Sequence, residues 1–144
     1  MTGSIGKRIA VLGTGAIGSC IGADPTIAGE EVILIDQWPA HIEAMKSRGL
    51  QVIMTEGSLH TPVQAMHCCD VCTLQQPFDI VFLTAKSYDS RWMVQLIEPY
   101  LRPNGVLVSL QNSLNDEITS LTKRIEQGSL RPASDNLAHL EKLI

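Results

Sequence analysis

The sequence predicts an α/β protein with a mostly parallel, doubly wound sheet. Short apolar runs alternate with helical patterns along the chain, and these runs are continuously apolar, as expected for strands that are buried on both faces. A glycine-rich turn joins the first apolar run directly to the first helical pattern. Strands that alternate with helices in this way form parallel sheets, because the helices serve as crossover connections.

The first half of the chain is expected to contain two strands, each followed by a helix. The apolar runs at 7–12 and 31–36 predict the strands, and the segments 16–28 and 39–48 predict the helices. Gly29 and Gly49 lie just past the expected helix ends, where glycine is favoured. Pro25 fits badly, because a proline inside a helix removes a backbone hydrogen bond and costs about 3 kcal/mol. We therefore expect either a kink in this helix or reduced stability.

The second half of the chain continues the alternation after an interruption. Residues 50–64 alternate and are punctuated by glycine, which predicts a hairpin or two short strands, whereas 68–76 gives no clear pattern. The expected later elements are a strand at 78–84, a helix that begins at Ser87 or Asp89 and runs to 101, a turn at 102–105, a strand at 106–110, a helix at 114–127, a linker at 128–135 and a short amphipathic tail. We expect one Rossmann-type domain at 1–117 and a helical tail at 118–144.

The composition excludes several classes of protein. The chain has 144 residues, of which 44% are hydrophobic and 18% charged, and this is normal for a globular domain. A formal net charge of −4, with scattered lysines and arginines, gives no reason to bind nucleic acid or an anionic membrane. No apolar run approaches the roughly 20 residues of a membrane span, and the first residues lack a leader pattern. We therefore expect a cytoplasmic protein.

The glycine turn predicts a binding site for a dinucleotide. Gly13, Thr14, Gly15, Ala16, Ile17 and Gly18 match G-x-G-x-x-G between a strand and a helix, which is the context that gives this motif its meaning. The first glycine permits the tight turn, the second lets the backbone approach a pyrophosphate, and the third lets helix and strand pack closely. The amide groups of the first helical turn would stabilise the phosphate charge. The alternative is a plain strand–turn–helix unit without a ligand.

An acidic residue at the expected place supports the dinucleotide interpretation. Asp36 ends the second predicted strand, 18 residues after Gly18. Its carboxylate is expected to accept both ribose hydroxyls and to repel a 2′-phosphate. The residues that follow it are Gln37 and Trp38, not arginine, so NAD(H) is favoured over NADP(H).

Two polar sites follow the later strands. Lys86 comes after the strand at 78–84, and Asn112 comes after the strand at 106–110. Open α/β sheets bind their ligands at the carboxyl ends of the strands, so both side chains are candidates for a catalytic site. The alternatives are a surface charge for the lysine and a turn former for the asparagine.

With these motifs the chain resembles the ketopantoate reductase family over about residues 7–117. The resemblance rests on Gly13 to Ser19, Asp36 to His41, Lys86-Ser87-Tyr88-Asp89 and Gln111-Asn112-Ser113, where Ser113 replaces the glycine of the family. It implies an NAD(P)H-dependent reductase of a 2-keto acid, with Lys86 and Asn112 lining the cleft beside the nicotinamide and the substrate. Asp36 departs from ketopantoate reductases proper, which have a basic residue near that strand end, so the substrate need not be ketopantoate.

The resemblance also implies a helical C-terminal domain, with a catalytic lysine and a substrate-binding glutamate, for which the segment 118–144 offers no counterpart. We therefore expect the cofactor-binding half alone, with a dimer or a separate helical domain as candidate partners. The alternatives are a non-catalytic dinucleotide-binding module and an inactive fragment.

The cysteines are not expected to form a site. His67, Cys68, Cys69 and Cys72 cluster in the sequence, but the C-x-x-C pair lacks the second pair that a tetrahedral metal site needs. The simpler interpretation is that small apolar thiols fill a strand and its exit. We expect no metal, and no hydrolase or Walker A motif is present.

Overall fold

The computed structural model describes residues 6–111. Its central sheet has five parallel strands in the order β5-β2-β1-β6-β7, and β3 and β4 form a separate antiparallel hairpin. The strands are β1 (Arg8–Leu12), β2 (Glu31–Asp36), β3 (Leu50–Met54), β4 (Gly57–Thr61), β5 (Gln64–His67), β6 (Phe78–Leu83) and β7 (Leu101–Ser109). The helices are α1 (Ala16–Ile27), α2 (Pro39–Arg48) and α3 (Ser90–Ile97), with 3₁₀ turns η1 (Cys68–Thr73), η2 (Ser87–Asp89) and η3 (Glu98–Tyr100). The predicted doubly wound α/β fold is confirmed.

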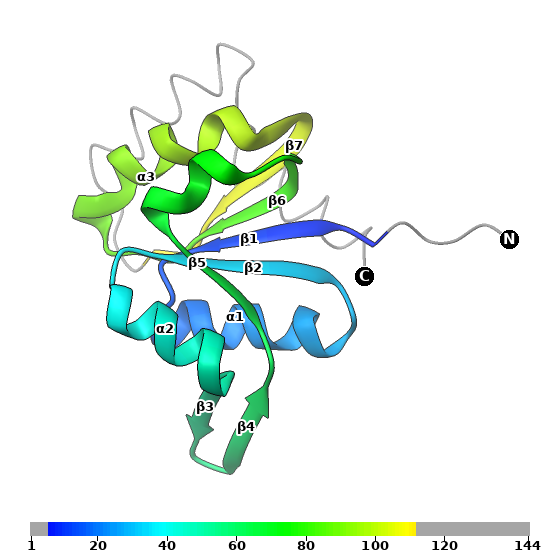
Figure 1. The fold of residues 1–144 in the computed structure, drawn as a ribbon, viewed down its shortest axis with the longest axis vertical. Helices are drawn as coiled ribbons and strands as arrows, with labels where there is room; N and C mark the ends of the chain where they lie inside the picture. Colours follow the sequence, from blue (N-terminus) through cyan, green and yellow to red (C-terminus); the bar gives the residue numbers. More distant parts are fainter. Residues whose placement is uncertain (1–5, 112–144) are drawn as a thin grey trace, which may run out of the picture.

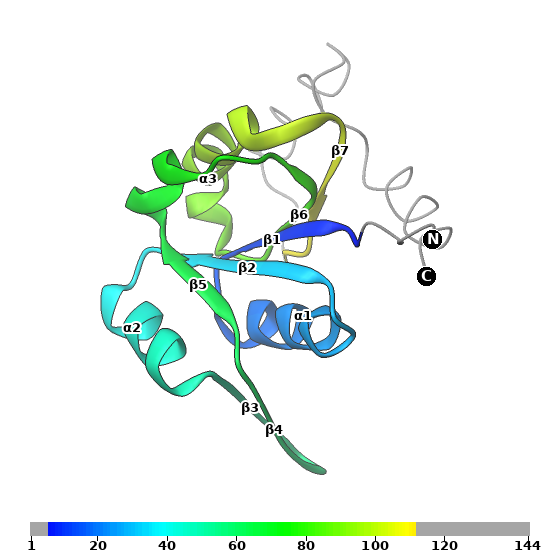
Figure 2. The same ribbon diagram turned by 45° about the vertical axis from the view of Figure 1, so that its right-hand side comes forward.

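The sheet separates two hydrophobic cores, because successive side chains of a strand point to opposite faces. On β1, Ile9 and Val11 pack with α1, α2 and the hairpin, whereas Ala10 and Leu12 pack with α3 and η1. Figures 1 and 2 show the same three layers, with α1 and α2 below the sheet and α3 above it. This packing on both faces is the reason that the strands read as continuous apolar runs.

Pro25 is accommodated near the end of α1. The helix continues past the proline to Ile27, and Ala28 and Glu30 donate backbone hydrogen bonds to Asp24 and Pro25. Because the proline lies in the last turn, the hydrogen bond that it removes is one of the last of the helix. The helix therefore forms despite the expected penalty.

The segment before the last strand differs from the prediction. Residues 102–105 were expected to form a turn, but β7 includes them, with a shift in its register against β6 between Phe78 and Ile80. The strand bulges outward there, since Phe78 pairs with Leu101 and Ile80 pairs with Val106. Glycine, proline and asparagine suit such an irregular, exposed stretch as well as they suit a turn.

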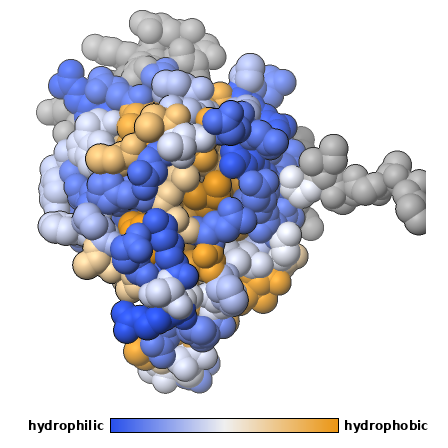
Figure 3. Space-filling view, in the orientation of Figure 1, coloured by the Kyte–Doolittle hydropathy of each residue, from blue (hydrophilic) through white to orange (hydrophobic). Residues whose placement is uncertain are grey.

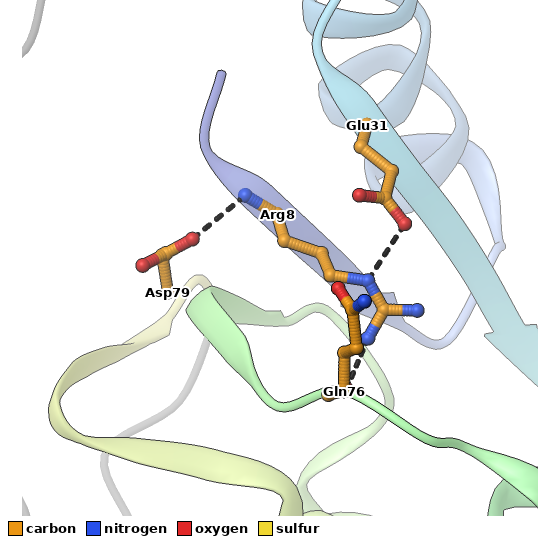
Figure 4. A network of polar contacts seen from close by, with 4 residues as sticks. All are labelled: Arg8, Glu31, Gln76 and Asp79. Carbon is orange, nitrogen blue, oxygen red and sulfur yellow. Dashed lines mark hydrogen bonds and ion pairs between the residues drawn. The ribbon is translucent and has the colours of Figure 1, made fainter. Parts of the chain in front are cut away.

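Arg8 links the amino ends of three strands. Its backbone N–H donates to Asp79 at 2.9 Å, and its guanidinium contacts Glu31 at 2.7 Å and the carbonyl of Gln76 (Figure 4). The guanidinium also lies 4.8 Å from the centre of the Phe78 ring. This polar network stands at the edge of the sheet opposite the candidate site and has a structural role.

The surface in Figure 3 is mostly hydrophilic, with apolar areas near the middle of the face shown and at its lower end, where the hairpin lies. Two hairpin residues, Ile53 and Met54, are exposed apolar side chains. None of the helices within residues 6–111 has the length and apolar character needed to cross a membrane. The predicted helices and linker beyond residue 113 lie outside the described residues.

Candidate dinucleotide site

A cleft of about 880 Å³ opens at the carboxyl ends of the central strands. These strand ends lie at the left of the sheet in Figure 1. Its size suits a small-molecule ligand. The loops after β1, β2 and β6 and the end of β7 form its walls. The lining residues are Gly13, Thr14, Gly15, Ala16, Ile17, Ser19, Asp36, Gln37, Trp38, His41, Thr84, Ala85, Lys86, Ser87, Tyr88, Asp89, Met93, Leu110 and Gln111. The structure thus brings the predicted glycine turn, Asp36 and Lys86 to one cleft.

The first glycine of the motif makes the turn between β1 and α1. Gly13 has a φ of +90°, and its N–H donates to the carbonyl of Ile35 at 2.9 Å. A Cβ atom at this position would lie 2.7 Å from the backbone N and Cα of Ala85. Both the positive φ and the closeness of the Ala85 backbone therefore require glycine here.

The third glycine lets α1 lie close to the sheet. A Cβ atom on Gly18 would lie 2.0 Å from the carbonyl oxygen of Gly13 and 2.6 Å from Oγ1 of Thr84. Thr84 Oγ1 in turn lies 3.0 Å from the carbonyl of Leu12 and 2.5 Å from that of Gly13. This hydroxyl fastens the turn to the end of β6.

The second glycine faces open space. A Cβ atom on Gly15 would meet nothing within 4 Å, and Gly15 itself is exposed at the cleft. Gly15 is also the N-cap of α1, and no side chain among the described residues caps this helix end. The backbone N–H groups of the first turn are thus left for solvent or a ligand. This open cradle fits a pyrophosphate group, and Ala16 and Ile17 form its exposed side.

Asp36 holds the glycine turn. One of its oxygens, Oδ2, accepts hydrogen bonds from the backbone N–H of Thr14 at 2.6 Å and from the Thr14 hydroxyl at 2.8 Å. The other, Oδ1, accepts from the backbone N–H of Trp38 at 3.0 Å. Asp36 is only 5% exposed. Since a carboxylate offers about four acceptor sites, these three bonds leave roughly one for a ligand.

The carbonyl of Thr14 is held as well. The hydroxyl of Ser19 lies 3.1 Å from it, and Nε2 of His41, on α2, lies 2.9 Å from it. His41 therefore carries its proton on Nε2, because a carbonyl can only accept. With its N–H, hydroxyl and carbonyl all engaged, Thr14 has no freedom to move without breaking contacts to α1, α2 and β2.

The Lys86 side chain lies on the opposite side of the cleft, after β6. It is exposed, and its ammonium group makes no hydrogen bond or ion pair with the other described residues. The backbone just before it is fixed by Gln111, whose Nε2 donates to the carbonyl of Ala85 at 2.8 Å. Gln111 also pairs with the hydroxyl of Ser90 at 2.6 and 2.9 Å. The backbone that carries Lys86 is thus held in place, and the Lys86 ammonium group remains free to contact a ligand.

Asn112, the second predicted catalytic residue, lies outside the described residues. The described chain ends at Gln111, which follows β7 and lines the cleft. The end of β7 therefore lies at the cleft. Asn112 itself is not described, so its contacts stay a prediction.

Several residues that shape the cleft escaped the sequence analysis. Thr84 hydrogen-bonds distant backbone and Ser90 hydrogen-bonds the Gln111 side chain, and neither was a candidate. His41 and Gln111 entered only as parts of family motifs. No spacing rule predicts such contacts. The one available signal for Thr84 is its place directly after a buried strand, at the edge where ligands bind.

The comparisons with known proteins agree with this geometry. A sequence model described as "Ketopantoate reductase PanE/ApbA" matches residues 9–134. A 2-dehydropantoate 2-reductase of Pyrococcus horikoshii is 34% identical over 110 residues, which are 76% of this chain and 34% of that protein. The solved 2-dehydropantoate 2-reductase of Geobacter metallireducens superposes with a TM-score of 0.66 at 27% identity, covering 79% of this chain and 37% of that one.

A solved D-mandelate dehydrogenase in ternary complex with NADH and anilino(oxo)acetate is similar too. Its TM-score is 0.69 at 26% identity, and the match covers 78% of this chain and 36% of the dehydrogenase. The chain thus spans about a third of the length of the proteins that it matches.

Proposed function

The chain belongs to the ketopantoate reductase PanE/ApbA family, and we propose that it supplies the cofactor-binding half of an NAD(P)H-dependent reductase of 2-keto acids. The observation that carries this proposal is the open cradle at Gly15, beside an uncapped helix end on the floor of the cleft. We assign residues 1–117 to this dinucleotide-binding unit. A cytoplasmic location fits an enzyme that draws on the nicotinamide pool of the cell.

The glycine turn is proposed to bind the pyrophosphate. Backbone N–H groups at Gly15, Ala16 and Ile17 would donate to the phosphate oxygens, and the dipole of α1 would stabilise their charge. The missing side chain of Gly15 lets the phosphates reach these groups. Hydrogen bonds fix Thr14, and close packing fixes Gly18. The site therefore needs little reorganisation when a ligand binds.

Asp36 is proposed to select the ribose of NAD(H). Its remaining acceptor site suits one ribose hydroxyl, which is fewer than the two expected from the sequence. A 2′-phosphate would approach a buried carboxylate, and Lys86 is the one lysine or arginine among the described residues that line the cleft. Lys86 follows β6, away from the end of β2, so no cation compensates that repulsion near Asp36.

Lys86 and Asn112 are proposed to act on the substrate. The reduced nicotinamide, when bound, supplies the hydride that converts a keto group into a hydroxyl group. The Lys86 ammonium would attract the carboxylate of a 2-keto acid or polarise its carbonyl, because it is free of other partners among the described residues. The Asn112 amide would hydrogen-bond the substrate hydroxyl or the carboxamide of the cofactor. The remaining groups of a complete active site would come from a helical partner domain or a second subunit.

Two measurements on the purified chain test this proposal. Calorimetric titration with NADH and NADPH should show binding of both, with NADH tighter. Oxidation of NADH should then be followed with a panel of 2-keto acids. Binding with turnover supports the reductase. Binding without turnover fits both a cofactor-binding half that lacks its partner domain and a non-catalytic module. The proposal would be overturned if neither NADH nor NADPH binds.

A further inference from the structure

Three potential metal ligands meet where β5 ends and η1 begins. A ring nitrogen of His67, Sγ of Cys68 and Sγ of Cys69 all lie within 4.8 Å of one another. His67 and Cys68 are half-buried, and Cys69 is exposed. The group is therefore anchored in the fold yet reachable from solvent.

Hydrogen bonds to both ring nitrogens fix the orientation of the His67 imidazole. Its Nε2 lies 2.7 Å from the carbonyl oxygen of Gln37, so the ring carries its proton on Nε2. The lone pair is then on Nδ1, which accepts a hydrogen bond from the backbone N–H of Cys69 at 3.1 Å and lies 3.8 Å from Sγ of Cys68. A metal ion would replace the Cys69 N–H on this lone pair. A backbone carbonyl on the far nitrogen is the usual partner of a metal-binding histidine, because it fixes the tautomer and the ring orientation.

We propose that His67, Cys68 and Cys69 bind one thiophilic divalent metal ion, such as Zn²⁺, through Nδ1 and the two thiolates. A solvent molecule would occupy the fourth position, since the thiol of Cys72 points to the carbonyl of Cys69 at 3.4 Å. In a tetrahedral site with zinc–sulfur bonds of about 2.3 Å, two thiolate sulfurs lie about 3.8 Å apart. The ligand atoms now lie within 4.8 Å of one another, so metal binding would draw them closer together.

This ligand set differs from the one that the sequence suggested. The C-x-x-C pair, Cys69 and Cys72, lacks a second pair and was discounted for that reason. The structure replaces it with three consecutive residues, which no spacing rule for zinc motifs describes. Consecutive residues can converge here because the chain turns from an extended strand into a 3₁₀ turn at His67.

The proposed metal site adjoins the dinucleotide cleft, because the carbonyl that holds His67 belongs to Gln37, a residue of the cleft lining. His67 pairs with Asp36 in the register of β5 and β2, so both sites lie at the carboxyl edge of the sheet. None of the three metal ligands lines the cleft, however. The two sites therefore have different ligand residues, and separate titrations with Co²⁺ and NADH measure their binding.

Titration of the reduced chain with Co²⁺ tests the proposal, because Co²⁺ replaces Zn²⁺ in thiolate sites and reports sulfur ligands by charge-transfer absorption in the near ultraviolet. We expect saturation at one equivalent and reversal by Zn²⁺. Cys68→Ser and Cys69→Ser should each lower the charge-transfer absorption by about half. His67→Ala should keep that band but weaken binding by at least about tenfold.

Cys20→Ser is the matched control, because this exposed thiol lies on α1, away from the three ligands. It should bind Co²⁺ as the parent chain does. Circular dichroism confirms that each variant is folded, and the exposed Cys69 provides a substitution that spares the core. Failure to saturate, or equal binding by the Cys68→Ser and Cys69→Ser variants and the parent, would overturn the site. NADH titration of the same samples is unaffected by that outcome.

Discussion

Asp36 and Thr14 form a two-point contact that joins the ends of β2 and β1. The Asp36 carboxylate accepts hydrogen bonds from both the N–H and the hydroxyl of Thr14, at 2.6 and 2.8 Å, and the contact is buried. It holds the glycine turn in a shape that can receive phosphate. A residue that the sequence predicted to bind ribose thus holds the glycine turn in place.

Asp36→Asn should lower both stability and affinity. The amide loses the charge and places a donor where Oδ1 or Oδ2 now accepts, so we expect the free energy of unfolding to fall by about 1.5–3 kcal/mol. NADH should bind more weakly, and its preference over NADPH should shrink. Urea denaturation and calorimetry measure the two effects. Glu43→Gln, an exposed carboxylate on α2, is the control. Stability equal to that of the parent would show that the contact with Thr14 contributes nothing.

Gly18→Ala and Gly15→Ala should separate folding from binding. The added methyl group at Gly18 would overlap the carbonyl of Gly13, with a separation of 2.0 Å, so we expect a loss of at least about 1–3 kcal/mol of stability. At Gly15 the methyl group meets nothing within 4 Å, so stability should fall only by the N-cap difference between glycine and alanine, about 1 kcal/mol or less. NADH binding should nevertheless weaken, because the methyl group enters the cradle. Thermal unfolding and calorimetry of both variants check this, and full NADH affinity in Gly15→Ala would contradict the placement of the pyrophosphate.

Lys86→Met should spare the fold and the cofactor but not the substrate. The ammonium group has no partner among the described residues, so stability should stay within about 0.5 kcal/mol of the parent. Binding of a 2-keto acid to the NADH-loaded chain should weaken by about tenfold or more, as expected for the loss of one charge-assisted contact. Lys46→Met removes a surface lysine of α2 and serves as the control. Unchanged binding of the keto acid would remove Lys86 from the substrate site.

Trp38→Ala should weaken NADH binding. The indole is 68% exposed on the rim of the cleft, beside Asp36, where it can stack on an adenine ring. Stacking of a base on an aromatic side chain is worth about 1–3 kcal/mol. ADP-ribose should quench Trp38 fluorescence in a Trp92→Phe background, which leaves one tryptophan. Nicotinamide mononucleotide should not quench it, and quenching by both fragments alike would exclude selective stacking on adenine.

Stability should decline at alkaline pH through Cys68. Burial of the Cys68 thiol raises its pKa, and the neighbouring Cys69 raises it further. The unfolded chain therefore loses this proton at a lower pH than the folded protein does. The resulting stabilisation is fully present below the ordinary thiol pKa of about 8.5 and decreases as the pH rises above that value. Urea denaturation between pH 7 and pH 10.5 should show this decrease in the parent and a smaller one in Cys68→Ala. If the stability of the parent and of Cys68→Ala declines in parallel with pH, Cys68 does not cause the decline.

Local patterns predicted most of the elements. The helix Pro39–Arg48 and the strand Glu31–Asp36 were predicted with these bounds, and the Phe78–Leu83 strand within one residue. Proline, glycine and continuous apolar runs act through nearest neighbours, which is why sequence alone suffices there. The short strand Gln64–His67 was missed because its residues are half-buried or exposed, without an apolar run.

The chain's own residue order determined the α/β alternation and the glycine turn, because backbone preference and apolar periodicity operate over a few neighbouring residues. The tertiary structure alone decided that Asp36 holds Thr14, that Gln111 pins the backbone before Lys86, and that His67, Cys68 and Cys69 point their ligand atoms together. Each of these depends on where separate strands end relative to one another or on how a side chain turns. Such positions follow from sheet register and packing across the whole fold, which no local pattern in the chain specifies.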